Sequence, residues 1–252
     1  MSIKVPALQS FGDNLNVAVI GASGGIGSAV LEHLVSNPNV QRILATSRRE
    51  PERVPAKTVW TSLDLRDEET IAAAARMAFN EDGLHLVMIA TGLLHNRDSL
   101  WPEKSWRTIN ADSLRQAYEI NTVGPTLVAK HFAPLLARDR KSVLTALTAR
   151  VGSIGDNRAG GWHAYRASKA ALNMCIKNVA IELQRRNPQS ICVGLHPGTV
   201  DTPLSMPFQK NVPAKQLFTP GQSATYMLEV LDCLFPHHSG RVIAWDGEEI
   251  CA

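Results

Sequence analysis

Residues 16–27 read NVAVIGASGGIG, and this stretch decides the fold. Its apolar half, 16–20, has the composition of a short strand, and the segment after the glycines reads as a helix. Strand, glycine-rich turn and helix in this order are the context of a dinucleotide-binding site, because free N–H groups at a helix N-terminus bind phosphate. The spacing is G-x-x-x-G-x-G, in which Gly21 permits a tight turn and Gly25 and Gly27 permit close backbone approach. A glycine-rich turn without a ligand is the alternative.

Strands and helices alternate along the rest of the chain. The expected strands are 16–20, 41–46, 58–61, 84–89, 142–147, 190–195 and 240–245. This alternation predicts an α/β fold, a single-domain doubly wound (Rossmann-type) parallel sheet of about seven strands that spans 1–252. Ligands of such sheets bind at the carboxyl ends of the strands. The residues expected at that edge are Gly21, Arg48, Asp64 and Gly92.

Composition and charge exclude several classes of protein. Hydrophobic residues at 44% and charged residues at 19% are ordinary globular values, which excludes a disordered chain. The formal charge of +3 is mild and the basic residues are spread out, which predicts no nucleic-acid partner. The four cysteines show no C-x-x-C spacing, so we expect neither a disulfide framework nor a metal site.

The sequence also predicts where the protein resides. No apolar run has the length of a signal-peptide core or of a membrane span, so we expect a cytoplasmic protein without membrane contact. The first residues, 1–14, contain proline and glycine, and we expect them to form a loosely held extension.

Two arginines follow the second expected strand. A site specific for NAD places an acid about 20 residues after the glycines, where it binds the ribose 2′-hydroxyl. Here the first acid is Glu50, and Arg48 and Arg49 precede it. Either guanidinium can pair with a 2′-phosphate, which favours NADP over NAD. Two solvated arginines in a loop are the alternative.

Tyr165 and Lys169 are four residues apart in a segment without helix breakers, so they share one face of a helix. A lysine ammonium favours the phenolate, so we expect the pKa of Tyr165 to be lowered and its hydroxyl to serve as a general acid and base. An ordinary surface helix with this spacing is the alternative.

Two further segments bear on a site. Pro125 lies inside a long helical pattern, 113–137, and its missing N–H frees the carbonyl of Asn121, which predicts a kink. The alternative is a proline tolerated near a helix start. The segment 203–218 holds three prolines, so we expect neither helix nor strand but a substrate lid or a surface loop.

Taken together, these motifs show that the sequence resembles the short-chain dehydrogenase/reductase family along nearly all of its length. The shared landmarks are Gly21-x3-Gly25-Ile26-Gly27, Asp64-Leu65, Gly92, Asn121, Tyr165-x3-Lys169, Pro197-Gly198-x3-Thr202 and Ser239-Gly240-Arg241. Within the family, residues 150–154 are most similar to the C-factor and sniffer-type carbonyl reductases. The segment that leads from there to Tyr165 is three residues longer, which is also similar to those reductases.

The resemblance implies a role for each matched residue. Tyr165 would protonate a carbonyl oxygen as hydride arrives, Lys169 would bind the nicotinamide ribose, and Asn121 would hold a water that relays protons to Lys169. The implied cofactor-binding residues are Gly21, Ser23, Gly25, Ile26, Gly27, Asp64, Leu65, Gly92, Tyr165, Lys169, Pro197, Gly198 and Thr202, in addition to Arg48. The helices of Tyr165 and Asn121 pair subunits in many relatives, which is compatible with a homodimer or homotetramer.

The sequence departs from the family at three positions. Ile20 and Ile89 replace polar residues near the cofactor, and Ala149 stands where the family has the serine that polarises the substrate carbonyl. Thr148, Ser153 or no residue at all replaces that serine, and we favour Thr148. His95, His163 and Trp162 are candidates for the pocket wall, although such residues are more often structural or solvent-facing.

We therefore expect an NADP-preferring oxidoreductase of the carbonyl reductase type that transfers a hydride between nicotinamide and a small carbonyl or alcohol substrate. The same scaffold with NAD, or an isomerase, is the nearest alternative. An NAD(P)-binding sensor or signalling protein with weak or no turnover is the alternative from another class, because of Ala149.

Overall fold

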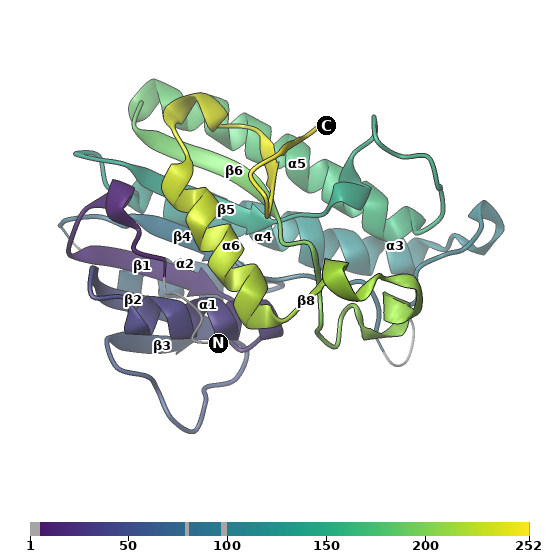
Figure 1. Ribbon diagram of the computed structural model, residues 1–252, viewed down its shortest axis with the longest axis horizontal. Helices are drawn as coiled ribbons and strands as arrows, with labels where there is room; N and C mark the ends of the chain where they lie inside the picture. Colours follow the sequence, from purple (N-terminus) through teal and green to yellow (C-terminus); the bar gives the residue numbers. More distant parts are fainter. Residues whose placement is uncertain (1–5, 79–80, 97–99, 252) are drawn as a thin grey trace.

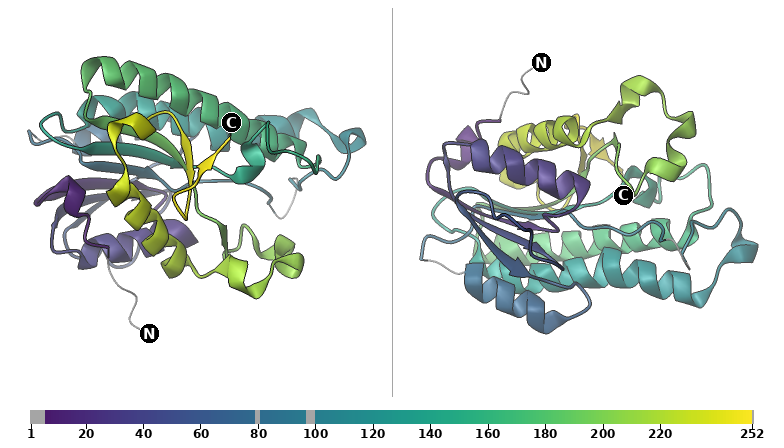
Figure 2. Two further views of the ribbon diagram at one scale, coloured as in Figure 1. Left: turned by 45° about the horizontal axis from the view of Figure 1, so that its top comes forward. Right: turned by 90° about the horizontal axis from the view of Figure 1, so that it is seen from below.

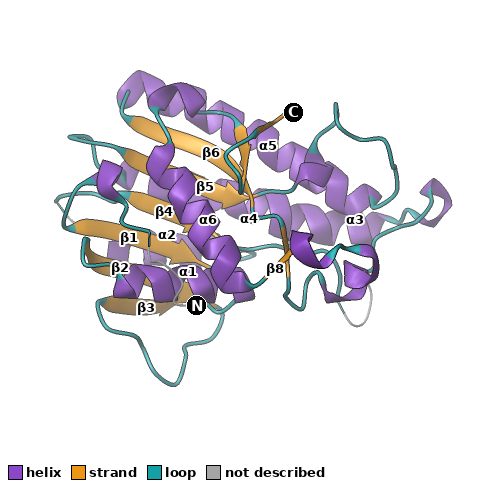
Figure 3. Cartoon of the chain, viewed as in Figure 1, coloured by secondary structure: helices purple, strands orange, loops and turns teal. Residues whose placement is uncertain are grey.

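The computed structural model describes residues 6–78, 81–96 and 100–251, and in these residues eight strands form one central sheet (Figures 1 and 3). The strands, in their order across the sheet, are β3 (Thr58–Ser62), β2 (Val40–Ser47), β1 (Leu15–Ile20), β4 (Leu86–Ile89), β5 (Ser142–Leu147), β6 (Ser190–His196), β9 (Val242–Ala244) and β10 (Glu249–Ile250). All neighbours are parallel except β9 and β10. The predicted doubly wound α/β fold is confirmed, and β10 is the strand beyond the expected seven.

Helices cover both faces of the sheet (Figure 2). One face carries α1 (Gly25–Ser36) and α6 (Pro220–Cys233), and the other carries α2 (Glu68–Ala78), α4 (Gly124–Phe132) and α5 (His163–Arg186). Successive side chains of a strand point to opposite faces, so Val17 and Val19 pack under α1 while Ala18 and Ile20 pack under α2. Burial on both faces explains why the central strands are continuous apolar runs. The acid at 67 and the alanines that follow predict a helix over 67–79, which corresponds to α2, and residue 79 lies outside the described residues.

The direction of the crossovers changes between β1 and β4, so this is the switch point of the sheet. Gly21 ends β1 there with φ 88°, a left-handed conformation that favours glycine. A Cβ atom at Gly21 would lie 2.7 Å from the γ-methyl of Thr91 and 3.2 Å from the carbonyl oxygen of Ala90. The glycine therefore lets the ends of two neighbouring strands approach each other.

The long helix expected at 113–137 is interrupted, as Pro125 suggests. It consists of α3 (Ala111–Tyr118), a π-helical turn (Glu119–Val123), α4 and a 3-10 turn (Ala133–Leu135). Pro125 is the second residue of α4, where a missing N–H costs little. The irregularity expected at Asn121 is this π-helical turn, which places Asn121 fully inside the protein.

The start of the chain is held more tightly than its composition suggests. Leu8 and Phe11 are each only 1% exposed and belong to the core between the sheet and α6. Two N–H groups of the 3-10 helix Gln9–Phe11 donate to the carboxylate of Asp232 at 3.1 and 2.8 Å. The expectation of a loosely held extension is therefore wrong for residues 6–14, and residues 1–5 lie outside the described part.

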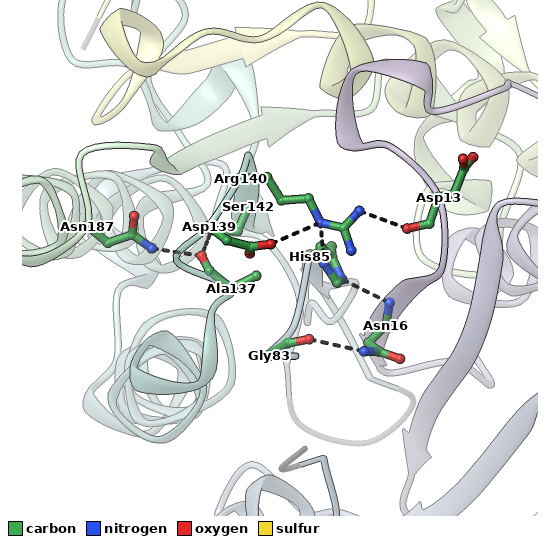
Figure 4. A network of polar contacts seen from close by, with 9 residues as sticks. All are labelled: Asp13, Asn16, Gly83, His85, Ala137, Asp139, Arg140, Ser142 and Asn187. Atoms are coloured by element: carbon green, nitrogen blue, oxygen red, sulfur yellow. Dashed lines mark hydrogen bonds and ion pairs between the residues drawn. The ribbon is translucent and has the colours of Figure 1, made fainter. Parts of the chain in front are cut away.

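A polar network ties this segment to the amino ends of the strands (Figure 4). Arg140 donates to the carbonyl oxygen of Asp13 at 2.8 Å, and its Nε faces Nε2 of His85 at 2.9 Å. The N–H of Asn16 donates to Nδ1 of His85 at 3.0 Å. Burial and the nearby Arg140 lower the pKa of His85, which keeps this internal imidazole neutral.

The segment 203–218 contains short regular elements, contrary to the expectation of neither helix nor strand. It forms two 3-10 helices, Met206–Asn211 and Ala214–Gln216, and β8 (Leu217–Phe218), which pairs with β7 (Thr199–Val200). This pairing closes the base of the loop. The segment and the N-terminal end of α5 project from the same end of the sheet (Figure 1). None of the helices in the described parts of the chain is long and apolar enough to span a membrane.

Candidate active site

Tyr165 and Lys169 lie one turn apart on α5, beside the carboxyl end of β5. Lys169 is only 2% exposed and donates from Nζ to the carbonyl oxygen of Leu147, the last residue of β5, at 2.7 Å. Its Nζ lies 5.9 Å from the centre of the Tyr165 ring. The expected shared helix face is therefore present, and the ammonium group is anchored to the sheet rather than to the phenol.

Burial moves the pKa of both residues away from the charged forms. It raises the pKa of Tyr165 to about 12 and lowers the pKa of Lys169 to about 7. The expected lowering of the Tyr165 pKa is wrong for this structure, because desolvation of the phenolate outweighs the attraction of a lysine that is itself losing its charge. At neutral pH Tyr165 is an uncharged phenol, which is the form that donates a proton.

Asn121 braces the loop after β4 against α5. Its side-chain oxygen accepts from the N–H of Leu93 at 2.7 Å, and its Nδ2 donates to the carbonyl oxygen of Leu93 at 2.8 Å and to Oγ of Ser168 at 3.1 Å. Ser168 in turn donates to the carbonyl oxygen of Tyr165 at 2.8 Å. The side chain of Asn121 is thus committed to holding Tyr165 in place, and the proton relay through its carbonyl stays a prediction.

Ala149, which stands at the position of the family's serine, and the two hydroxyl residues that could replace that serine have different surroundings. Ala149 and Thr148 both line a cavity that Tyr165 also lines. The Thr148 hydroxyl donates to the side-chain oxygen of Asn173 on α5 at 2.6 Å. Ser153 is outside the lining and its Oγ accepts from the N–H of Asp156 at 3.0 Å. Of the two hydroxyls, only that of Thr148 belongs to a residue that lines the cavity with Tyr165, and it already donates its hydrogen bond to Asn173.

Two cavities at the carboxyl ends of the strands contain most of the predicted cofactor-binding residues. One, of about 270 Å³, is lined by Gly21, Ser23, Arg48, Asp64, Leu65 and Gly92. The other, of about 280 Å³, is lined by Ile26, Tyr165, Pro197, Gly198 and Thr202. The first cavity lies at the switch point, and the second lies beside the start of α5.

Gly25 and Gly27 line neither cavity and serve the turn itself. A Cβ atom at Gly25 would lie 2.8 Å from Cγ2 of Thr202, and one at Gly27 would lie 2.2 Å from the carbonyl oxygen of Gly21. Any side chain at Gly27 would therefore push the turn apart. The glycines shape a cradle at the N-terminus of α1, where N–H groups can bind phosphate.

The first cavity also contains groups suited to the 2′-phosphate of a dinucleotide. Arg48 lines it and Arg49 does not, and no ion pair among the described residues engages Arg48. The Thr91 hydroxyl in the lining is buried without a hydrogen-bond partner, as expected of a group that a ligand satisfies. Sequence reasoning missed Thr91, although its place beside Gly92 is a signal.

The segment 203–218 covers the second cavity with Leu204, Ser205, Phe208 and Val212. Trp162 also lines this cavity, whereas His95 and His163 do not. His95 instead contacts the segment from outside, with Nε2 at 3.2 and 3.1 Å from the carbonyl oxygens of Pro203 and Leu204. In the described residues no cluster of three or more His, Cys, Asp or Glu side chains has the arrangement of a metal site.

A family model described as short chain dehydrogenase matches residues 15–213. The chain belongs to the short-chain dehydrogenase family. It is 32% identical over 235 residues to the 1-hydroxy-2-glutathionyl-2-methyl-3-butene dehydrogenase of a Rhodococcus species, covering 92% of this chain and 96% of that protein. It is 36% identical over 137 residues to the C-signal protein of Myxococcus xanthus, covering 54% of this chain and 77% of that protein.

Solved structures of this family superpose on the whole fold. An NADPH-bound carbonyl reductase from chicken fatty liver has a TM-score of 0.79 and 26% identity, covering 95% of this chain and all of that one. These similarities confirm the family resemblance of the sequence and its likeness to C-signal and to carbonyl reductases.

Replacement of Lys169 by Met should remove a pH dependence of stability. The pKa of Lys169 is about 7 in the folded protein and 10.5 when exposed, so between these values the unfolded chain binds more protons and the free energy of unfolding rises with pH. The rise for the wild type is about 1 kcal/mol between pH 7 and pH 8. Urea denaturation at both pH values measures it.

A matched control is Lys141→Met. Burial lowers the pKa of Lys141 to about 8, so its contribution has the same sign but falls mainly at higher pH. An unchanged rise from pH 7 to pH 8 in Lys169→Met would contradict the assignment to Lys169.

Proposed function

We propose that the protein is an NADP-preferring oxidoreductase that transfers a hydride between nicotinamide and a small carbonyl or alcohol substrate, with Tyr165 as general acid and base. The observation that carries this proposal is the position of Tyr165, which lines the second cavity while Lys169 lies one turn behind it. The NADPH-bound carbonyl reductase at 26% identity supports the same chemistry.

The residues of this chain would divide the work as follows. NADPH, when bound, supplies the hydride. Tyr165 holds its proton at neutral pH because its pKa is about 12, so it can donate to a carbonyl oxygen above it. Lys169, when protonated, stabilises the phenolate that remains. A protonated resting phenol suits reduction of a carbonyl better than oxidation of an alcohol, which needs the phenolate first.

The cofactor would lie across both cavities. The glycine turn and Ser23 would receive the pyrophosphate at the N-terminus of α1, and Asp64 with Leu65 would flank the adenine. Arg48 would pair with the 2′-phosphate. Pro197, Gly198 and Thr202 line the second cavity and would hold the nicotinamide next to Tyr165.

Tyr165→Phe should lower kcat for carbonyl reduction by about 10²-fold or more, because only the proton donor is removed. NADPH binding, measured by fluorescence titration, should stay close to that of the wild type. Tyr118→Phe is the matched control, since Tyr118 is 37% exposed on α3 and lines neither cavity. Unchanged turnover in Tyr165→Phe would rule out the mechanism.

Arg48→Ala should weaken NADPH binding by about 10- to 100-fold, because a charge-assisted contact with phosphate is lost. NADH binding should change little, since NADH lacks the 2′-phosphate. Arg49→Ala serves as the control, because Arg49 lies outside the cavity. Equal losses for both cofactors in Arg48→Ala would place the phosphate contact elsewhere.

Thr148 would supply the missing hydrogen bond to the substrate carbonyl by releasing Asn173. We expect Thr148→Val to lower kcat by about tenfold or more, and Ala149→Ser in that background to restore part of the loss. Steady-state assays with the best carbonyl substrate test both. A silent Thr148→Val combined with a strongly faster Ala149→Ser would mean that the native chain has no such donor.

That last outcome would favour an NAD(P)-binding sensor or signalling protein. Two observations support this second candidate: Ala149 offers no hydroxyl, and the Thr148 hydroxyl is bonded to Asn173. The 36% sequence identity to the C-signal protein of Myxococcus xanthus over 137 residues also supports a signalling role. Nicotinamide absorbance, followed with NADPH and a panel of ketones, aldehydes and quinones, separates an enzyme from a sensor.

A further inference from the structure

Trp162, directly before α5, has a backbone conformation that is costly for a bulky residue. Its φ is 51° and its ψ is 42°, and it follows Gly160 and Gly161, whose φ values are 63° and 65°. Glycine takes such values freely, whereas tryptophan does so only where its surroundings impose them. Among the described residues Leu8, Asn14 and Lys57 also have a positive φ, but only Trp162 lines one of the two cavities. Strain at a ligand site can be part of its function, so Trp162 is a candidate for a functional role.

Glu103 holds Trp162 in this conformation. The N–H of Trp162 donates to the carbonyl oxygen of Glu103 at 2.5 Å, and the N–H of Ala164 donates to Oε2 of the same residue at 3.2 Å. Glu103 is 5% exposed, and a Cβ atom at Gly161 would lie 3.2 Å from its carbonyl oxygen. One buried residue thus fixes both Trp162 and the first turn of the helix that carries Tyr165.

The Trp162 ring forms part of the wall of the second cavity, near Tyr165. Its centre lies 6.4 Å from the ring of Tyr165 and 4.9 Å from the ring of Phe208, which the 3-10 helix Met206–Asn211 carries. Trp101 and His95 pack on the outer side of Phe208, with ring centres at 6.1 and 5.7 Å. Rings from three separate segments therefore form one aromatic wall.

The lining of this cavity carries no formal charge near neutral pH. No Asp, Glu, Lys or Arg is among the described residues that line it. Its imidazole, His196, stays neutral because burial lowers its pKa to about 4. A charged substrate would lose its hydration here without gaining a partner, so the lining selects against it.

We propose that Trp162 is a specificity-determining residue, which with the contacting ring of Phe208 forms the aromatic wall of a slot for an uncharged, ring-bearing carbonyl compound and places its carbonyl group at Tyr165. This inference rests on the proposed carbonyl chemistry and adds the substrate class. Stacking on aromatic rings adds affinity beyond the area that is buried. The slot should therefore prefer a phenyl ketone to a saturated ketone of similar shape.

The test compares acetophenone with cyclohexyl methyl ketone in Trp162→Leu, Trp162→Phe and the wild type. In Trp162→Leu, KM for acetophenone should rise roughly three- to tenfold with little change in kcat, since a ring contact is lost. KM for cyclohexyl methyl ketone should change by less than about twofold, and Trp162→Phe should restore acetophenone binding. Trp106→Leu is the control, because Trp106 is 70% exposed and outside the cavity.

Two further measurements distinguish a loss of substrate binding from a loss of stability and from a loss of turnover. Trp162→Gly keeps the left-handed backbone without strain, so its Tm should be no lower than that of Trp162→Leu while its affinity for acetophenone is equally reduced. Saturation-transfer NMR on the protein with NADP⁺ measures ketone binding without catalysis.

Absence of turnover in the wild type would defeat the proposed function, whereas weaker acetophenone binding in Trp162→Leu would still support the slot. Equal losses for both ketones, or no loss for either, would overturn it.

Discussion

The contact between α5 and the end of β5 is the constraint on which the candidate site depends. Lys169 reaches across it to the carbonyl oxygen of Leu147 at 2.7 Å. A Cβ atom at Gly152 would lie 2.8 Å from Cβ of Lys169, so the close approach of this loop to α5 requires glycine at position 152. A side chain at Gly152 would push α5 outward and carry Tyr165 away from the second cavity.

The same contact sets the electrostatics of the site. Close packing removes water from Tyr165 and Lys169 alike, and desolvation favours the neutral form of each. The phenol therefore keeps its proton, while the amine is close to half-charged at neutral pH. A phenol that keeps its proton, next to an amine that can still gain charge, is a consequence of burial and not of the four-residue spacing.

Local sequence patterns predicted the elements whose causes are local. Apolar runs gave the central strands, and the glycines of 21–27 gave the turn at the switch point, because burial on both faces and positive φ each leave a residue signature. β10 has only two residues, too few for a pattern. The burial of Phe11 depends on α6, more than two hundred residues later, which no local window contains.

In the candidate site, too, features with local causes could be predicted from the sequence, and features that depend on distant residues could not. Spacing placed Tyr165 and Lys169 on one helix face, and the pair of arginines pointed to the adenosine end of the cofactor. The sign of the Tyr165 pKa shift depends on how deeply α5 is buried, which only the folded chain decides. The Thr148 hydroxyl finds its partner on another element, at Asn173, so its availability could not be judged from its neighbours in the sequence.

The two ends of the sheet satisfy their polar groups differently, and this difference marks the functional end. At the amino ends, Nδ1 of buried His85 lies 3.0 Å from the N–H of Asn16, and Arg140 contacts the same ring and donates to the carbonyl oxygen of Asp13. Around the cavities and the first turns of α5, buried atoms without hydrogen-bond partners are found in Thr91, Glu103, Arg166 and His196. Unpaired buried groups cost folding free energy. A chain whose buried polar groups are paired at one end of the sheet and unpaired around the cavities at the other is suited to bind a ligand at the second end.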